Sequence, residues 1–212
     1  MGRLHIDLFT TLDGVAQAPG APEEDPSDGF TFGGWQAPLD DEMVGEQVVA
    51  GIAAMDALLL GRRTYDIFAA YWPLHETGPI GTALAEVPKY VASRGTPELT
   101  WRSSTLLGPD LAGEVGALRE RYENVHVIGS VDLVQTLVAE NLFDVLTLWV
   151  YPVVLGQGKK VFPDGATPNR LELLEPPLTG SRGTVQLRYG PTGARPTTGD
   201  MTLTEPGEGP GA

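Results

Sequence analysis

The ten residues from Asp56 to Tyr65 constrain the fold more than any other part of the chain, because they read D-A-L-L-L-G-R-R-T-Y. A short apolar run stops at Gly61, and an amphipathic pattern with two arginines follows at once. This order predicts a buried strand that enters a glycine turn and opens a helix. Backbone N–H groups at a helix start are unpaired and carry partial positive charge. With Arg62 and Arg63 beside them, the turn predicts a binding site for phosphate.

Alternating strand and helix patterns run along most of the chain. We expect strands at residues 4–9, 57–60, 89–93, 100–103, 125–128, 145–150, 171–174 and 184–189. We expect helices at residues 38–55, 64–71, 111–122 and 131–140. This order predicts an α/β fold with a mostly parallel central sheet, an antiparallel end and helices on both faces. Residues 1–190 are expected to form one domain, and the Pro-, Gly- and Thr-rich residues 191–212 a flexible tail.

Composition limits the classes of function. The chain has 212 residues, of which 42% are hydrophobic and 20% charged, as is typical of a globular domain with a full core. Its net charge of −14 argues against nucleic acid or an anionic membrane as a partner, since both need a basic surface. No apolar run is long enough to span a membrane, and the first residues lack the apolar segment of a signal peptide. Cysteine is absent and the three histidines show no metal-ligand spacing, so we expect a cytoplasmic protein without a metal.

Three expected strand ends carry residues suited to phosphate: Gly61 to Thr64, Ser93-Arg94 and Gly129 to Asp132. In a parallel sheet, ligands bind outside the carboxyl ends of the strands, where all three segments lie. Each segment alone has an ordinary alternative, since it can be a surface turn, a loop or a helix cap. Together they favour a dinucleotide site, although the G-x-G-x-x-G fingerprint of ordinary Rossmann sites is missing.

Five short motifs, taken in order, resemble the dihydrofolate reductase superfamily. They are L-D-G at 12–14, L-L-L-G-R-R-T-Y at 58–65, K-Y-V-A-S-R at 89–94, V-I-G-S at 127–130 and P-V-V-L-G-Q-G at 152–158. The branch they resemble most is the C-terminal reductase domain of the riboflavin-biosynthesis deaminase-reductase, as a stand-alone domain without the cysteine-bearing deaminase half. The resemblance implies a dihydrofolate-reductase-like fold, an NADPH cofactor, hydride transfer to a pteridine- or pyrimidine-like substrate, and a homodimer.

The resemblance also implies which residues hold the cofactor. The G-R-R-T turn and the Ser-Arg pair match residues that bind the 2′-phosphate and pyrophosphate of NADPH, and the turn before the next helix matches the pyrophosphate cradle. The implied phosphate-binding residues are Gly61, Arg62, Arg63, Thr64, Ser93, Arg94, Gly129, Ser130, Val131, Asp132 and Leu133. The loop after the first strand matches the nicotinamide side, which implies Asp13, Val15, Ala16 and Gln17. Many relatives carry two or three glycines where this chain has Gly129-Ser130-Val131, and the side chain of Val131 limits positive φ unless the residue is already helical.

Hydride transfer to a C=N bond also needs a proton donor. The sequence W-x-x-P-x-D from Trp35 to Asp40 resembles the start of the substrate helix in dihydrofolate reductases, which makes Asp40 one candidate and Thr147 its companion on a facing strand. The alternative is that Asp40 or Asp41 only caps the helix. Asp7 is the second candidate, because it lies on the strand face opposite Leu4, Ile6 and Leu8, toward the expected cleft, and an acid inside a sheet strand is uncommon. Its alternative is a solvent-facing position near a sheet edge.

The substrate side is less sharply marked. Candidate contacts for a planar ring are Phe9, Phe32 and Trp35, although the aromatic residues of the long loop can equally form a cluster that pins it. A phosphorylated substrate would need a second basic site, for which the candidates are Lys159, Lys160 and Arg182. A second class of function stays open, namely a non-catalytic nucleotide-binding protein on the same fold.

Overall fold

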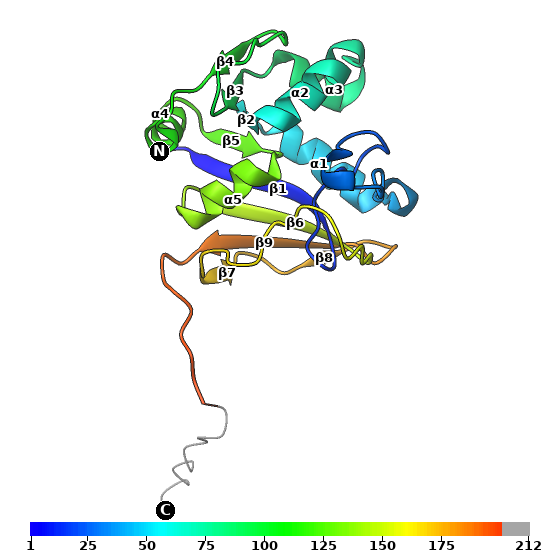
Figure 1. Cartoon of the computed structure of the whole chain (residues 1–212), viewed down its shortest axis with the longest axis vertical. Coiled ribbons are helices and arrows are strands. Elements are labelled where there is room, and N and C mark those ends of the chain that lie inside the picture. Colours follow the sequence, from blue (N-terminus) through cyan, green and yellow to red (C-terminus); the bar gives the residue numbers. More distant parts are fainter. Residues whose placement is uncertain (201–212) are drawn as a thin grey trace, which may run out of the picture.

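The computed structural model describes residues 1–200, which form an α/β fold around one sheet (Figure 1). The strand order is β4-β3-β2-β5-β1-β6-β9-β7, and β8 pairs with β9. The six strands from β4 to β6 run parallel, whereas β9 is antiparallel to β6, β7 and β8, which confirms the predicted fold class. The strands are β1 Arg3–Thr11, β2 Ala57–Gly61, β3 Lys89–Ala92, β4 Ser104–Leu106, β5 Asn124–Val127, β6 Val145–Tyr151, β7 Leu171–Leu173, β8 Leu178–Thr179 and β9 Val185–Pro191.

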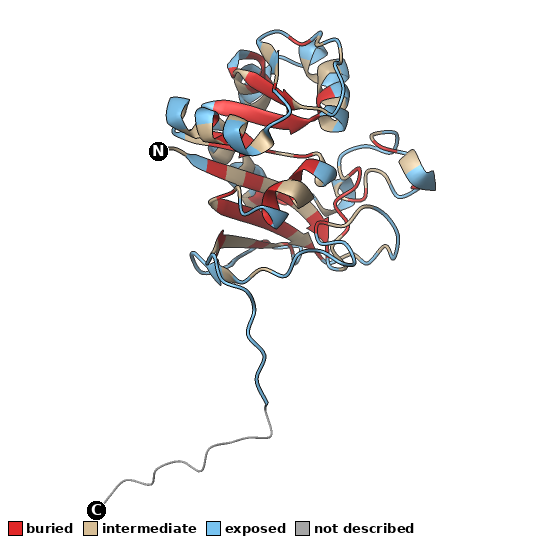
Figure 2. Ribbon diagram, turned by 60° about the vertical axis from the view of Figure 1, so that its left-hand side comes forward, coloured by how far each residue is buried: buried red, intermediate tan, exposed pale blue. Residues whose placement is uncertain are grey.

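Helices cover both faces of the sheet. They are α1 Glu42–Ala53, α2 Arg62–Tyr71, α3 Gly78–Glu86, α4 Leu111–Arg121 and α5 Val131–Ala139, with short 3₁₀ helices at Ser27–Gly29, Ala37–Leu39 and Trp72–Leu74. Burial alternates along β1, where Ile6 packs in one cluster with Val115 of α4 and Leu133 of α5. On the other face, Leu58 of β2 packs with Tyr65 of α2. The strands are therefore buried between helices whose outer sides are exposed (Figure 2).

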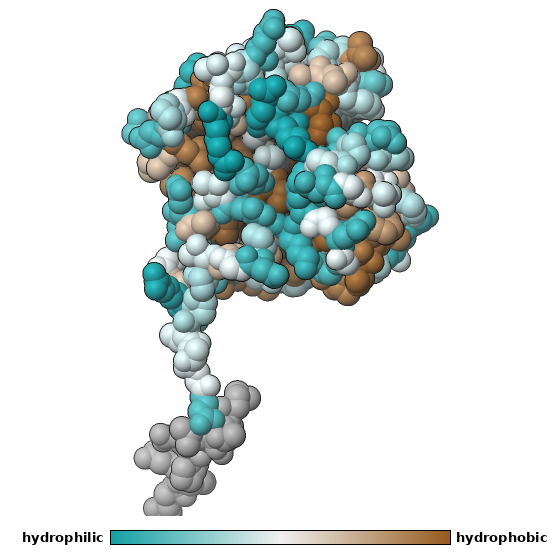
Figure 3. Space-filling view, in the orientation of Figure 1, coloured by the Kyte–Doolittle hydropathy of each residue, from teal (hydrophilic) through white to brown (hydrophobic). Residues whose placement is uncertain are grey.

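A third apolar cluster lies beside α1, at the carboxyl ends of β1 and β6. Its buried members include Val15, Trp35, Val44, Trp149 and Tyr151. The cluster joins the long loop after β1 to the first turns of α1, so this loop is packed rather than free. The molecular surface is mainly hydrophilic on the face seen in Figure 1, with smaller hydrophobic patches between the polar side chains (Figure 3).

The predicted helix 38–55 begins too early, because two elements share that stretch. Pro38 lies in the 3₁₀ helix Ala37–Leu39, and α1 begins at Glu42. Asp41 is the N-cap of α1, where its extended backbone lets the carboxylate accept a hydrogen bond from the Met43 N–H at 3.0 Å. The structure thus gives the capping role to Asp41 and leaves Asp40 between the two helices.

Two elements differ from expectation around β3. The predicted strand 100–103 is wrong, because β4 covers Ser104–Leu106 and the residues before it form a bend and a turn. Trp101 is buried in that bend, and its backbone N–H donates to Tyr65 Oη at 2.9 Å. Helix α3 has no counterpart in the expected elements. Its proline lies in the first turn, where a missing N–H costs nothing, and its Leu84 is buried.

Strands β1 and β6 extend beyond their neighbours at the carboxyl edge of the sheet. The pairing of β1 with β5 ends at Ile6–Val127, whereas the pairing of β1 with β6 continues to Thr11–Tyr151. Because Leu59 is level with Val127, the end of β2 lies only two residues beyond Ile6. The carboxyl ends of β2 and β5 therefore lie beside the longer strands β1 and β6, which continue past them.

The described chain leaves the sheet after β9. Residues 192–200 contain no helix or strand. Thr192 and Ala194 are still hydrogen-bonded to the backbone of Arg170, and the chain beyond them runs away from the rest of the structure (Figure 1). The tail expected at 191–212 begins one residue too early, since Pro191 belongs to β9, and residues 201–212 lie outside the described residues. None of the helices in residues 1–200 is long and apolar enough to cross a membrane.

Candidate active site

Helices α2 and α5 begin side by side at the carboxyl edge of the sheet, and their turns interlock. Gly61 ends β2 and caps α2, and its N–H donates to the carbonyl of Gly129 at 3.1 Å. A Cβ at Gly129 (φ +128°) would lie 2.8 Å from Thr64 Oγ1, so the close approach of the turns requires glycine. Ser130 caps α5 by accepting a hydrogen bond from the Leu133 N–H at 3.5 Å. The N-termini of two helices therefore lie at one edge of the sheet, a geometry suited to phosphates.

Val131 does not disturb this geometry. It is the first residue of α5, so its backbone is helical. The positive φ of the turn is at Gly129, two residues earlier. The expected conflict between a β-branched side chain and a left-handed backbone therefore does not arise at Val131.

Each arginine matched to the cofactor phosphates is held by a carboxylate. Arg62 Nε lies 2.7 Å from Asp66 Oδ2, one turn further along α2. Arg94 Nη2 lies 3.2 Å from Asp132 Oδ2, which connects the segment after β3 to the first turn of α5. The side chain of Arg94 is 89% exposed, and exposed pairs of this kind contribute little to stability. Both guanidiniums are therefore available to a competing anion.

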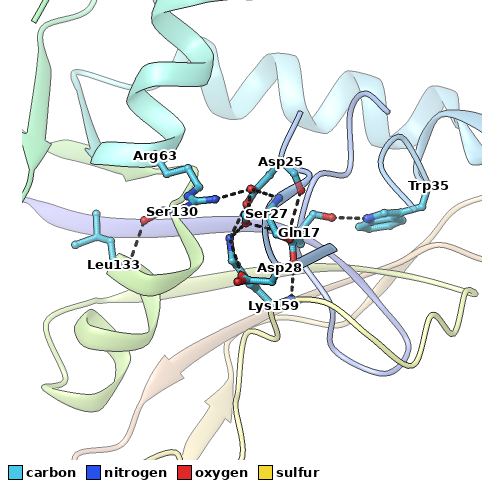
Figure 4. Close-up of polar contacts among 9 residues, drawn as sticks. All are labelled: Gln17, Asp25, Ser27, Asp28, Trp35, Arg63, Ser130, Leu133 and Lys159. Carbon is cyan, nitrogen blue, oxygen red and sulfur yellow. Dashed lines mark hydrogen bonds and ion pairs between the residues drawn. The ribbon is translucent and has the colours of Figure 1, made fainter. Parts of the chain in front are cut away.

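Arg63 is held differently, by a buried carboxylate from the long loop (Figure 4). Asp25 Oδ1 lies 2.6 Å from Arg63 Nη1, and Asp25 Oδ2 lies 2.7 Å from Lys159 Nζ. Ser27 Oγ donates to the same carboxylate at 2.6 Å. Burial alone raises the pKa of Asp25, but hydrogen bonds from Lys159, Ser27 and Arg63 outweigh it and lower the pKa to about 2. Asp25 is therefore ionised, and it neutralises two cations from distant elements.

Gln17 fixes the same loop through its side chain and its backbone. Its Nε2 donates to the carbonyls of Asp25 and Ser27 at 3.0 and 3.1 Å, and its Oε1 accepts from the Lys159 N–H at 2.9 Å. Its own carbonyl accepts from Trp35 Nε1 at 2.8 Å. A cavity of about 210 Å³ lies beside these groups and is also lined by Gly158. The side chain of Gln17 is therefore buried and hydrogen-bonded at both ends of its amide.

The rest of the segment matched to the nicotinamide is also anchored. Asp13 accepts hydrogen bonds from Thr11 Oγ1 at 2.6 Å and from the Gly156 N–H at 2.8 Å. Burial raises the pKa of Asp13, but these hydrogen bonds and that from the backbone of residue 155 outweigh it, so the pKa is lowered overall. Val15 and Ala16 are buried beneath this turn. The loop after β1 is thus tied to the glycine loop after β6.

The candidate substrate aromatics form two groups. Phe9 lies between Trp149 and Tyr151, with ring centroids at 6.3 and 6.1 Å, and Trp35 meets Tyr151 edge-on at 5.5 Å. Trp35 is only 8% exposed, so it supports the loop rather than covering an open cleft. Phe32 is 44% exposed, and its ring contact is with Phe30 rather than with this group.

Tyr151 connects this aromatic group to the segment before α1. Gln36 Nε2 donates to Tyr151 Oη at 2.8 Å. Burial raises the pKa of Tyr151 to about 12, against the hydrogen bond from Gln36, and the negative charges of Asp40 and Asp41 add to the rise. Asp40 therefore lies near the aromatic group without belonging to it.

Asp7 lies in the middle of the sheet, because β1 is flanked by β5 and β6. The alternative of a position near an edge is therefore wrong. Asp7 is level with Thr147 of β6, so the structure brings these two candidates together. Its Oδ2 lies 2.7 Å from Nδ1 of His126, a residue outside the expected site, and the ring of His126 stacks on that of His5.

The candidates for a second basic site do not gather into one cluster. Lys159 is held by Asp25, and Arg182 Nη1 donates to the carbonyl of Pro38 at 3.0 Å. The carbonyl of Lys160 accepts a hydrogen bond from Gln135 at 2.7 Å. The side chains of Lys159 and Arg182 are thus engaged by different segments.

Comparison with known families places this geometry in context. The family described as the RibD C-terminal domain matches residues 3–182. The chain belongs to the RibD C-terminal domain family. It is also 26% identical over 196 residues to the protein YyaP of Bacillus subtilis (strain 168), described as uncharacterized, over 88% of this chain and 94% of YyaP.

Two solved structures show the fold of this RibD C-terminal domain. A putative riboflavin biosynthesis protein from Shewanella sp. PV-4 has a TM-score of 0.64 and 18% identity, over 90% of this chain and 99% of that one. Dihydrofolate reductase from Enterococcus faecalis, solved in complex with NADP(H), has a TM-score of 0.56 and 16% identity, over 90% and 97%. Family membership indicates a reductase-type enzyme of the RibD and dihydrofolate reductase kind.

In this RibD C-terminal domain, the residues at the carboxyl edge fit a dinucleotide phosphate. The glycine at 129 permits the close approach of two helix N-termini, and three arginines surround them. Reasoning from the sequence missed Asp25, His126 and Tyr151. His126 had a usable signal, since it alternates with two buried valines in a strand beside β1, but Asp25 lies in a loop without periodicity.

Proposed function

We propose that this protein is an NADPH-dependent reductase that transfers a hydride to a small heterocyclic substrate of the pteridine or pyrimidine class. The observation that carries the proposal is the meeting of the α2 and α5 N-termini at Gly61 and Gly129, surrounded by Arg62, Arg63 and Arg94. Helical N–H groups and bidentate arginines together recognise phosphate monoesters and pyrophosphate. Membership of the RibD C-terminal domain family supports both the reaction class and the substrate class.

The chain's own residues divide the work of binding. Arg62, Arg63 and Arg94 bind the 2′-phosphate, with help from Thr64 and Ser93. The first turn of α5, residues 130–133, holds the pyrophosphate through its backbone. The anchored segment 13–17 backs the nicotinamide, which supplies the hydride when bound. Phe9 and the aromatic group around it form the substrate wall.

A comparison of NADPH with NADH tests the phosphate site. We expect NADPH to bind at least about tenfold more tightly, because only NADPH carries the group that pairs with the arginines. Arg63→Ala and Arg94→Ala should each weaken NADPH binding about tenfold and leave NADH binding nearly unchanged. Arg195→Ala is the matched control, since this arginine is exposed beyond β9. Isothermal titration of wild type and the three variants measures the affinities, and equal affinity for the two nucleotides would contradict the proposal.

Turnover separates the reductase from a non-catalytic nucleotide-binding protein. Oxidation of NADPH, followed by its absorbance in the presence of pyrimidines and pteridines, is the expected activity. Tight NADPH binding without oxidation by any substrate of either class would favour the non-catalytic protein.

We further propose a cytoplasmic homodimer. Leu173 of β7, the adjacent Leu174 and Leu178 of β8 are 47%, 47% and 38% exposed on the antiparallel end of the sheet. Burial of such side chains against a second copy would remove apolar surface from water. Light scattering on a size-exclusion column measures the mass, and a monomer at all concentrations would rule out the dimer.

A further inference from the structure

A polar cluster lies in the centre of the sheet, on the face opposite α4 and α5. Asp7 Oδ2 lies 2.7 Å from His126 Nδ1, and the ring of His126 stacks on that of His5 at 4.7 Å between centroids, with the planes 8° apart. His126 and His5 are level with each other on neighbouring strands, and His126 is level with buried Leu58 of β2. A carboxylate and two imidazoles therefore occupy a part of the sheet face where apolar side chains would be expected.

Such a cluster does not favour stability, which indicates that it serves another purpose. Buried ionisable groups lose hydration, and apolar replacements of similar size often stabilise a protein. Nε2 of His5 is buried and has no hydrogen-bond partner within residues 1–200. Burial lowers the pKa of His5, as does the neighbouring His126, while Asp7 opposes both. Titratable groups held under these conditions are typical of reactive sites.

The position of the cluster points toward the cofactor edge. Continuing the strand registers places Gly61 and Gly129 level with Leu8, so Asp7 lies one residue, about 3.3 Å along the strand, before their turns. The side chain of Asp7 is 29% exposed, whereas that of His126 is only 10% exposed. Asp7 is thus the outer, accessible member, and the imidazoles lie behind it.

The other charged groups around Asp7 are few. Arg188 of β9 is level with Thr147, which is level with Asp7, and Arg188 is held by Glu175 at 3.0 Å. Arg188 and Arg3 both lower the pKa of His5, by less than burial and His126 do. Within the described residues, His126 is therefore the direct ionic partner of Asp7.

We propose that Asp7 is a catalytic residue that delivers the proton of the reduction, and that His126 is the positioning residue that holds and recharges it. This inference rests on the proposed reductase function. When bound, NADPH would supply a hydride to the carbon of a C=N bond, so the electron pair of that bond would move to nitrogen. The Nδ1 proton of the His126 imidazolium passes to the Asp7 carboxylate, and Asp7 delivers it to that nitrogen. The neutral imidazole then takes a proton from the solvent, so each turnover consumes one hydride and one solvent proton.

Binding of a probe tests the location without any turnover. The probe is 2,4-diaminopyrimidine, added to the ¹⁵N-labelled full chain and followed by NMR. We expect the signals of Asp7, Thr147 and His126 to shift, and the shifts to be lost in Asp7→Asn. Shifts confined to other parts of the chain, or unchanged binding by Asp7→Asn, would overturn the proposal.

Titration of His5 provides a second readout. The pKa of His5 should fall in Asp7→Asn, which removes a neighbouring negative charge, and should rise in His126→Gln, which removes a neighbouring positive one. The matched control is His75→Gln, because His75 also stacks on an aromatic ring and bonds through Nδ1, yet lies on the surface. A His5 titration unaffected by both variants would show that the three groups are not coupled, which would overturn the relay.

Activity provides the third readout. Asp7→Asn should lower kcat about 100-fold with NADPH affinity unchanged, as is typical for loss of a general acid. His126→Gln should lower kcat about tenfold and change the shape of its pH profile, which a purely structural role would not do. If wild type neither binds nor oxidises NADPH, the proposed function fails. If wild type turns over and folded Asp7→Asn retains kcat within about threefold, only the present inference fails.

Discussion

At the residue scale, the candidate site is organised by ion pairs between aspartates and basic side chains. Arg62 and Arg94 pair with exposed carboxylates, whereas buried Asp25 holds Arg63 and Lys159 from two different elements. An exposed pair is easily broken, but a buried carboxylate that loses its partners leaves an uncompensated charge. Asp25 therefore determines how firmly the long loop is attached over the edge of the sheet.

Replacement of Asp25 by asparagine should lower the free energy of unfolding at neutral pH by about 2 kcal/mol, because an amide accepts these hydrogen bonds more weakly. The pKa of Asp25 is lowered from 3.8 to about 2 in the folded protein. Its contribution is therefore present above the ordinary pKa and is lost as the pH falls through the lowered one. Urea unfolding at several pH values should show the difference from wild type shrinking between about pH 4 and pH 2. Exposed Asp164→Asn is the control, and a difference independent of pH would contradict this account.

At the element scale, the site depends on two helices that begin within contact of each other. The turn before α5 has a positive φ at Gly129, and any side chain there would meet Thr64 of α2. Gly45 inside α1 and Gly116 inside α4 are different, since a Cβ at either position would meet no neighbouring atom within 4 Å among the described residues. The same residue type is therefore required at one place and free to change at another.

Gly129→Ala and Gly116→Ala should move stability in opposite directions. The first should lower the free energy of unfolding by about 1–3 kcal/mol, because alanine is strained at that φ and crowds Thr64. The second should raise it by about 0.5–1 kcal/mol, because alanine favours the helix interior. Thermal and urea unfolding measure both. A stable Gly129→Ala variant with normal NADPH binding would show that the two turns do not need their close approach.

The elements could be predicted where apolar runs are continuous, as in 57–60 and 145–150, since burial on both faces selects such sequences. The position of β4 could not be predicted, because its three residues, S-T-L, form no apolar run. Helix α3 could not be predicted either, because Gly78-Pro79 resembles a loop. The strand-to-helix turns at Gly61 and Gly129 could be predicted from their turn chemistry, and the binding roles of the arginines beside them stay a prediction. The Asp25 contact could not be, because 38 residues separate it from Arg63 and only packing brings them together.

At the scale of the whole molecule, Lys89 stands out because burial disfavours the charged form of its side chain. The chain has 28 acidic and 14 basic residues, yet one of its few lysines is fully buried. Its Nζ donates to the carbonyl of Ala85 at 2.9 Å and lies 4.3 Å from the ring centroid of Trp101. Burial, helped by the positive charge of Arg102, lowers the pKa of Lys89 to about 8 against the opposing effect of Glu76.

Lys89 should make the stability of the protein rise in alkaline solution. Between the folded pKa of about 8 and the ordinary value of 10.5, the unfolded chain binds the proton and the folded chain does not. The free energy of unfolding therefore gains a rising contribution across this window. Lys89→Met should remove that rise without a large loss at neutral pH. Urea unfolding of both proteins at about pH 7 and pH 10 gives the test, and an identical pH dependence would contradict it.

The acidic residues beside the three arginines affect how the ligand preference of such a site can evolve. Because each guanidinium already has an internal anion, the proposed cofactor binding would exchange one anion for another rather than add an anion to bare positive charge. In this arrangement, another phosphate would also have to displace an acidic side chain before it could pair with one of these arginines. Substitutions at Asp66 or Asp132 should therefore change the preference for NADPH over NADH while every arginine stays in place. Evolution could alter cofactor preference through these acidic residues as well as through the arginines.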